Sequence, residues 1–572
     1  MTFINRSLHT RFMAAVACAL LAVPLGAQDL RNAQFKPEGN KIRRVLTDNY
    51  LPPAVHAIQV RGETMLDSMI QGGKLSLSEQ DAINLALANN VDMNVQRYVP
   101  YLQLWGIEGA RGVLNPVVQF SPLMTRNVTP ATSALQGGAS VLSLSNSYNL
   151  NVHKPFESGL DFDFNYSTVR ARTNSFFSSL NPSVTSLWSI GFTQHLLQGF
   201  GNVSRGRFLW VARNNYGISV ENFSVSVINI VNSVLNAYWN LVYNDEDIAV
   251  KEASLKLAQL TLEQTQIQEQ VGTMAPLDVL QAQAQAASVN QQLIVSRYNR
   301  RITEDQLKKL ISANSSANLM TATIVPTGKV LPPPPPPGGL QDAIQRALEV
   351  RPEVKAQLLN LANSIIQVDY ARNQLRPILD FSMGYSQNGL GGTNVVRDYS
   401  NGFFNAPIIA VIPGGLGQSL SSLFSGSNIG YNLSFMLRVP IGNDQARANS
   451  AQAQITYKQG EEALHALRQQ ITYQVRQAYD AGALNQASAQ AAQVAVDYQE
   501  KRLKGEQDKF ALGASTTFLV LQAQRDLDSA RNVLLQAKVA WIQSRIALDQ
   551  AVGDTLAAHN IVLEETLNLP KK

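Results

Sequence analysis

One stretch near the start of the chain decides the fold because it occurs twice. It reads Leu77-Ser78-Glu79-Gln80-Asp81-Ala82-Ile83-Asn84-Leu85-Ala86-Leu87 and recurs as Gly338-Gly339-Leu340-Gln341-Asp342-Ala343-Ile344-Gln345-Arg346-Ala347-Leu348. The offset of 261 residues (338 − 77) holds without a gap to Pro116 and Pro377, which occupy the same place in the two copies. So constant a spacing indicates a tandem repeat, with one structural unit in each half.

A second pair of landmarks lies further along each half. Val271-Gly272-Thr273 and Val279-Leu280-Gln281-Ala282-Gln283 recur as Leu512-Gly513-Ala514 and Val520-Leu521-Gln522-Ala523-Gln524, at an offset of 241 (512 − 271). The first half therefore holds 20 more residues between its landmarks, in loops or extra strands. Six prolines, 332–337, favour a stiff polyproline II connector. The predicted organisation is a first repeat over 75–331, a linker over 332–339, a second repeat over 340–556 and a tail over 557–572.

Each repeat contains a helix too long for an ordinary globular domain. From Ser204 to Val271 the chain has no proline over 68 residues, about 100 Å as one helix. Two apolar series run along it: Ile228, Val231, Leu235, Tyr238 and Val242, and Phe223, Val227, Ile230, Val234, Ala237 and Leu241. Two seams predict neighbours on two sides, as in a closed ring of helices. The second repeat has the same layout from Ala446 to Leu512.

Both long helices are predicted to end in tight hairpins. Gly272 and Gly513 suit the left-handed conformation that closes a helix, and Pro276 suits the first turn of the next one. The returning arms are expected over about 276–311 and 518–552.

Strands are predicted after Pro116 and Pro377. Apolar and polar residues alternate over 379–386, 429–439 and 188–193. Such strands suit a membrane barrel with a wet lumen, or equally a soluble antiparallel sheet with one buried face. A further hairpin over 142–168 gives six strands if it joins the sheet and four if it does not. Residues 389–428, rich in Gly and Ser, are predicted to form a long surface loop.

The N-terminus has the pattern of a secretory signal over residues 1–27. Arg6 and Arg11 precede an apolar stretch of about 14 residues, too short to span a membrane, and Ala27 suits cleavage. Residues 28–74 would form a periplasmic extension. Cys18 is the only cysteine; it belongs to the apolar stretch or, alternatively, to a lipidation signal. After cleavage the chain would have no thiol, which excludes disulfides and cysteine-bound metals.

The composition argues against several functional classes. Charged residues make up only 16% of the chain, and cleavage lowers the formal net charge from +5 to about +3, too little to suggest nucleic acid. The six histidines are scattered, with no pair at metal-ligand spacing, and phosphate-binding and nucleophile-elbow motifs are absent. We therefore expect no enzymatic activity, no cofactor and no metal.

The chain resembles the TolC-like outer-membrane efflux proteins. The resemblance rests on the duplicated Ala-Ile-x-x-Ala-Leu opening, on Arg351-Pro352-Glu353, on the two strand starts after proline and on the first hairpin tip, Val271-Gly272-Thr273-Met274-Ala275-Pro276-Leu277-Asp278. It covers about residues 75–565. It implies an α+β membrane protein located in the cell outer membrane, with a periplasmic helical domain. Three chains would share one β-barrel in the outer-membrane lipid and one α-barrel of coiled-coil hairpins.

The resemblance also implies partners and site residues. A periplasmic adaptor would dock at Val271, Gly272 and Thr273 on one tip and at Leu512, Gly513, Ala514 and Ser515 on the other. It would link the duct to an inner-membrane pump of RND, ABC or MFS type, for efflux or type I secretion. Asp278 would narrow the periplasmic gate, or it only stabilises the first turn of its helix. Leu519 stands at the equivalent place in the second tip, and Met274 replaces a basic residue of the family, so the gate departs from the family pattern.

One alternative from another class remains. A secreted coiled-coil structural or adhesive surface protein without a lumen would also have long helices and alternating strands. A duct predicts detergent-requiring trimers in the outer membrane, whereas a scaffold would be soluble without detergent.

Overall fold

The computed structural model describes Tyr50, Pro52, Val55, Leu66 and residues 68–132, 139–176, 178–313, 317–333, 338–400 and 406–563. The chain divides into two units, Met1–Ala57 and Ile58–Lys572, and the helices and strands below all belong to the second. The predicted signal peptide, most of the predicted extension over 28–74, residues 334–337 of the proline run and the last residues of the tail lie outside the described residues.

The structure repeats with the spacing of the sequence. Helices α4 (Glu79–Asn89) and α5 (Val91–Arg111) correspond to α10 (Leu340–Val350) and α11 (Pro352–Gln374), each beginning 261 residues later. Strand β3 (Val117–Pro130) corresponds to β8 (Ile378–Arg397) at the same offset. Short helices α6 (Asn202–Arg205) and η2 (Gly112–Leu114) adjoin the junction between helices and strands. The tandem repeat predicted from sequence is therefore also a repeat of elements.

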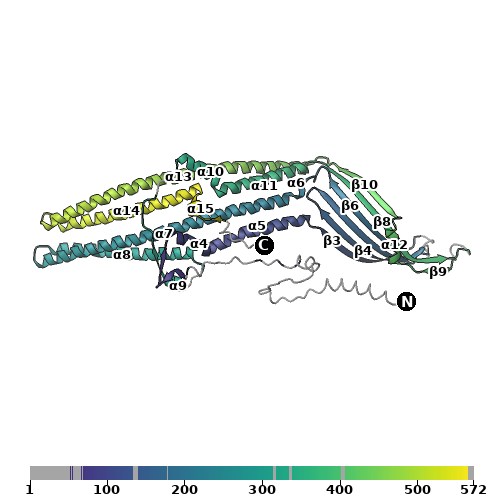
Figure 1. Ribbon diagram of the computed structural model, residues 1–572, viewed down its shortest axis with the longest axis horizontal. Coiled ribbons are helices and arrows are strands. Elements are labelled where there is room, and N and C mark those ends of the chain that lie inside the picture. The colour runs from purple at the N-terminus through teal and green to yellow at the C-terminus, as the bar shows by residue number, and fades with distance from the viewer. Residues whose placement is uncertain are drawn as a thin grey trace. The chain divides into compact units, whose positions relative to one another are not determined.

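Two helical hairpins extend away from the strands (Figure 1). The first is α7 (Arg207–Gln270) with α8 (Pro276–Ile311), and the second is α13 (Asp444–Ala511) with α14 (Thr517–Val552). Their tips and returning arms are offset by 241 residues, as the second sequence match predicts. At 1.5 Å per residue the 64 residues of α7 span about 96 Å.

Helix α7 has neighbours on two sides, as its two apolar seams predict. It packs on α5 and α8 along one side and on α11 and α14 along the other. Within the described residues it is also the one helix that could cross a membrane by length and composition, and half of its most apolar window is buried inside the protein. Packing against the chain's own helices accounts for that apolar character.

Midway along α7, a small sheet is surrounded by a hydrophobic core to which several helices contribute. Its strands are β1 (Ile70–Gln71), β2 (Lys74–Leu77) and β7 (Thr323–Pro326), with β2 parallel to β7. Leu75, Leu77 and Ile324 are fully buried there against α4, α7 and α8. Helix α9 (Ala317–Thr321) directly precedes β7 in the chain, and Leu556 of α15 (Thr555–Ala558) packs against the same core. This sheet, part of which precedes the first repeat, was not predicted.

The main sheet contains six long antiparallel strands in the order β10-β8-β6-β5-β4-β3. The remaining bounds are β4 (Ser140–Pro155), β5 (Leu160–Thr173), β6 (Leu180–His195) and β10 (Ile429–Arg438). Strands β4 and β5 are the predicted hairpin over 142–168, so the six-strand alternative is the one observed. Because they have no counterpart in the second repeat, they explain why the first repeat is longer.

The prediction of a long surface loop over 389–428 is wrong. Strand β8 continues to Arg397, β9 (Ile408–Ile412) pairs with its end, and α12 (Leu416–Phe424) packs back on β8 and β6. The glycines that suggested a loop are needed for this packing. A Cβ on Gly389 would lie 2.1 Å from the Ser419 carbonyl oxygen, and one on Gly391 would lie 2.5 Å from that of Gly415.

Candidate functional site

The first hairpin tip is a compact turn closed by backbone hydrogen bonds. Gly272 has φ +82°, the left-handed conformation predicted from the sequence. Its N–H donates to the Glu269 carbonyl (2.8 Å), and the Thr273 N–H and hydroxyl both donate to the Gln268 carbonyl (2.9 and 3.0 Å). Pro276 then begins α8 at its first turn. The turn satisfies the last carbonyls of α7 with few residues, and Val271 remains exposed at 73%.

The second tip repeats the turn with different side chains. Gly513 has φ +73°, and the Ala514 N–H donates to the Lys509 carbonyl (2.8 Å). The Ser515 hydroxyl donates to the Glu506 carboxylate (2.8 Å), and the Thr516 side chain caps α14 by accepting from the Leu519 N–H. Leu512 is exposed at 85%.

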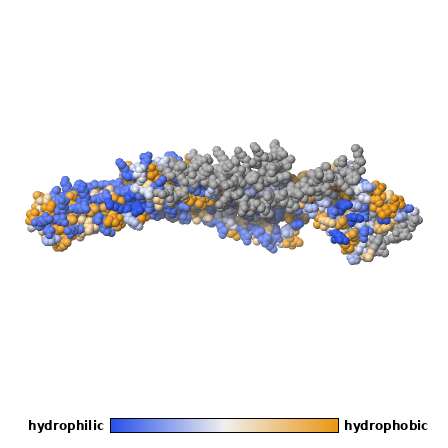
Figure 2. Space-filling view, turned by 90° about the horizontal axis from the view of Figure 1, so that it is seen from below, coloured by the Kyte–Doolittle hydropathy of each residue, from blue (hydrophilic) through white to orange (hydrophobic). Residues whose placement is uncertain are grey.

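The two tips lie side by side. The Thr517 hydroxyl is 3.5 Å from the Met274 sulfur, so the position where the sequence departs from the family pattern joins one tip to the other. Exposed apolar side chains surround this contact: Val271, Leu277, Leu280, Leu512, Phe518 and Leu519. Figure 2 shows hydrophobic residues gathered at this end of the visible face. Asp278 is half-buried in the first turn of α8 beside this patch.

Polar contacts join the hairpins above the tips. The Ser254 hydroxyl donates to the Asp528 carboxylate, and the Gln524 amide donates to Thr261 (2.9 Å). Lys251, 7% exposed, donates to Gln292 on α8 (3.0 Å). Buried polar contacts fix the register between α7 and α14 because each partner is costly to leave unsatisfied. Burial raises the pKa of the Asp528 carboxyl, with opposing contributions from Ser254, Lys251 and Arg531.

Asp528→Asn is expected to stabilise the fold at neutral pH and to lose that advantage in acid. A raised folded-state pKa means that folding favours the protonated carboxyl; stability is therefore highest below the pKa of the unfolded state and falls as pH rises through the folded-state value. Asparagine keeps an acceptor for Ser254 without the buried charge. Thermal unfolding of the purified protein between pH 4 and pH 8 measures this difference. Asp526→Asn, two residues earlier and exposed beside Arg502, is the matched control and should change little. A lower unfolding temperature for Asp528→Asn at pH 8 would refute the assignment.

The main sheet has one apolar face and one polar face. Cross-strand aromatic pairs lie on the apolar face: Phe162 with Phe192, Trp188 with Tyr385, and Phe381 with Phe435, at centroid distances of 5.3, 5.4 and 4.9 Å. The opposite face carries Ser382, Ser189, Asn165 and Asn149 at alternating positions of adjacent strands.

Where the sheet meets the helices, its polar face carries a band of imidazole and carboxylate side chains. This band was not predicted from the sequence. His195 Nδ1 is 2.6 Å from Asp380, and His195 Nε2 is 3.5 Å from Asp161. His153 Nδ1 is 2.8 Å from Asp163, and Arg205 donates to Asp161 (2.8 Å). The band spans four adjacent strands, β4, β5, β6 and β8. Alternation places these residues on the polar face, but only the register of the folded sheet brings them into one row.

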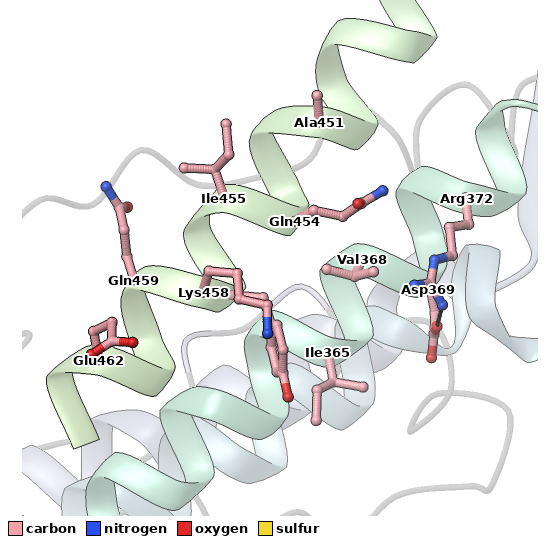
Figure 3. A pocket seen from close by; sticks show the side chains of 11 residues that line it. Ile365, Val368, Asp369, Arg372, Ala451, Gln454, Ile455, Lys458, Gln459 and Glu462 are labelled. Atoms are coloured by element: carbon pink, nitrogen blue, oxygen red, sulfur yellow. Dashed lines mark ion pairs between the residues drawn. The ribbon is translucent and has the colours of Figure 1, made fainter. Parts of the chain in front are cut away.

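A groove of about 1040 Å³ lies between α11 and α13 (Figure 3). Ile365 and Val368 from α11 face Ile455 and Gln454 from α13 across it. Three of its charged side chains form ion pairs on the surface: Arg372 with Asp369 at 3.9 Å, and Lys458 with the neighbouring Glu461 at 2.7 Å. No buried polar group converges on it among the described residues, and it does not resemble a catalytic pocket. In the described part of the chain no cluster of His, Cys, Asp or Glu could hold a metal ion.

Both the sheet and the row of helices have unpaired edges. Strands β3 and β10 end the sheet, and almost every residue of both is exposed. The helices follow the orders α5-α7-α11-α13 and α8-α7-α14-α13, so α13 ends the row on one side and α5 with α8 on the other. Exposed apolar residues run along these ends: Val91, Val95, Leu102, Ile294 and Tyr298 on α5 and α8, and Ile455, Tyr473, Leu484 and Tyr498 on α13. Long unpaired strands and exposed apolar helix faces are typical of surfaces that pair with another chain.

An amphipathic sheet joined to long helical hairpins, open at both edges, defines a channel-forming protein of the outer-membrane efflux class. The model of the family described as outer membrane efflux protein matches residues 159–313 and 343–554. The chain belongs to this family, which places it in the outer membrane with its helical part in the periplasm. The family consists of channel proteins, not enzymes.

Known relatives agree with this assignment. The outer membrane protein TolC of Escherichia coli (strain K12) is 23% identical over 422 residues, covering 72% of this chain and 77% of TolC. The CmeC outer membrane channel of Campylobacter jejuni superposes with a TM-score of 0.59 at 15% identity, covering 94% of this chain and 98% of that one. The MtrE outer membrane channel of Neisseria gonorrhoeae, in its open state, gives 0.56 at 16% identity, covering 84% and 89%. Family membership favours the duct over a surface protein without a lumen.

Proposed function

We propose that three copies of this chain form a passive duct that carries cargo from the periplasm, or from an inner-membrane pump, to the outside. The observation that supports this most strongly is the pair of open edges. Pairing β3 of one copy with β10 of the next, and α13 with α5 and α8 of the next, would continue both layers into closed barrels. A closed barrel leaves no unpaired backbone in the membrane, which a single open sheet would.

The two sheet faces support an orientation. The aromatic face would contact lipid, and the polar face with its imidazole–carboxylate band would line a water-filled lumen. Three copies of the band would place a ring of carboxylate side chains in the lumen where the β-barrel meets the helical tunnel. The tips would be the docking surface for a periplasmic adaptor, because the exposed apolar side chains around Met274 and Thr517 lie at the end of both hairpins.

Asp278→Asn is expected to reduce cation preference without preventing conduction. In the trimer three Asp278 carboxylates would surround the periplasmic mouth and attract cations. Single-channel recording in a planar bilayer under a salt gradient should show a fall of roughly twofold or more in the cation-to-anion permeability ratio. Asp369→Asn, on α11 and remote from the tips, serves as the control. Unchanged selectivity in Asp278→Asn would mean that this acid only stabilises its helix. No conductance from well-folded wild-type protein would count against the duct itself.

A further inference from the structure

Charged residues are divided between the two faces of the main sheet. All three carboxylates in its six long strands, Asp161, Asp163 and Asp380, lie on the polar face. The aromatic face carries none. It does carry Arg126 on β3 and Arg170 and Arg172 on β5, in the positions that alternate with polar-face residues. Arginine on a face whose large side chains are mostly apolar is unusual and suggests a specific anionic contact.

The strand register gathers these three arginines into one patch. Arg126 and Arg172 are both paired with Leu144 of β4, which separates them by two strand spacings, about 10 Å. Arg170 lies two residues before Arg172 on the same face. All three are exposed, and the described residues provide no ion-pair partner for them. By contrast, Arg205 at the other end of the sheet forms an ion pair with Asp161.

The patch lies at a defined height on the aromatic face. Lys154, the basic residue of that face nearest the helices, is ten residues from Leu144 along β4. Ten residues are about 34 Å along a strand, or roughly 24 Å across the sheet at a tilt of 45°. The outward apolar band of a membrane barrel is about 25 Å tall. Since the helices are periplasmic, Lys154 lies at the inner boundary of that band and the arginine patch lies at the outer boundary.

At the same height, helix α12 covers the neighbouring strands β6 and β8 of this face. Arg170 is paired with Val184 of β6, which is paired with Gly391 of β8. Helix α12 lies over Gly391, and its Ser419 hydroxyl is 2.9 Å from the Ser186 hydroxyl on the same face. Helix α12 therefore covers β6 and β8 at the height where β3 and β5 present guanidinium groups without an ion-pair partner among the described residues. A shallow basic site remains beside α12.

We propose that Arg126, Arg170 and Arg172 bind the phosphate groups of outer-leaflet lipid headgroups. Guanidinium groups bind phosphate through paired, charge-assisted hydrogen bonds. Two of these groups lie about 7 Å apart along β5 and the third about 10 Å away across the sheet, a spacing that suits a headgroup with more than one phosphate. This inference rests on the proposed function, because it requires the aromatic face to contact lipid. It adds a defined lipid site at the outer boundary of the barrel.

The test compares lipid binding by three forms of the full-length protein purified in detergent. These are the wild type, the triple variant Arg126→Gln/Arg170→Gln/Arg172→Gln, and the charge-matched control Arg447→Gln/Arg468→Gln/Arg476→Gln, which changes exposed arginines of α13. Thermal unfolding and native mass spectrometry follow titration with diphosphoryl lipid A, with its fully dephosphorylated form, and with inorganic phosphate alone. Conductance in planar bilayers is recorded for the same samples.

The wild type and the control should bind and be stabilised by diphosphoryl lipid A. The patch variant should bind it roughly tenfold or more weakly, with its conductance unchanged. Equal binding of the dephosphorylated lipid, full competition by inorganic phosphate at equal concentration, or undiminished binding by the patch variant would overturn the proposal. If the wild type conducts but fails to bind, only the lipid site is wrong. If the wild type does not conduct, the duct is wrong, whatever the lipid result.

Discussion

Replacing Val271 and Leu512 together by aspartate is expected to abolish export in cells while leaving the assembled protein intact. Both side chains are almost fully exposed at the ends of the hairpins, at 73% and 85%, so no core packing is lost. An apolar contact made by both tips would have to bury two new charges per chain, and burying an unpaired carboxylate is far more costly than losing the apolar contact. With three copies, six charges would oppose docking.

Export is measured by complementation of a strain that lacks the chromosomal copy. Outer-membrane level, heat-modifiable oligomer and single-channel conductance are measured beside it. The conservative pair Val271→Ile/Leu512→Met is the matched control and should restore export, because it keeps the apolar surface. Normal export by the aspartate pair would show that the tips only turn the chain. Loss of both export and conductance would point to misfolding.

The largest effect on stability is expected from Glu304→Gln on α8. Glu304 is 6% exposed and accepts from Arg300 (2.6 Å), Lys308 (2.9 Å) and the Ile324 backbone N–H (3.0 Å). It therefore joins the returning helix of the first hairpin to the small sheet at β7. Glutamine leaves Lys308, itself buried, without its counter-ion, and removing one partner of a buried pair typically costs about 3 kcal/mol or more.

The measurement is the unfolding midpoint of the purified protein, with proteolysis around α9 and β7 as a local readout. Glu252→Gln is the matched control, since Glu252 forms an exposed pair with Arg297 at 2.7 Å and should change stability by no more than about 0.5 kcal/mol. Equal losses in the two variants would mean that burial at Glu304 contributes nothing special.

The local sequence pattern was sufficient to predict those features whose geometry is determined within a single helix or turn. The bounds of α8, the left-handed Gly272 and Gly513, and the tandem offsets of 261 and 241 could all be predicted from spacing and turn chemistry. Two seams on α7 also predicted its two sets of neighbours, because buried faces of a long helix must repeat at helical spacing. The loop predicted over 389–428 failed because glycine indicates a turn as readily as a close approach, and only the position of α12 distinguishes them.

The amino-acid pattern alone was enough to predict the repeat, the helical hairpins with their tips and the apolar–polar alternation of the strands, and its motifs pointed to the outer-membrane family. The tertiary structure decided the six-stranded order, the row formed by His153, Asp163, Asp161, His195 and Asp380, the contact between Met274 and Thr517, and the patch of Arg126, Arg170 and Arg172. Periodicity assigns each residue to a face of its own helix or strand. Which residues of different strands become neighbours depends on register, and register is set by the packing of the whole sheet.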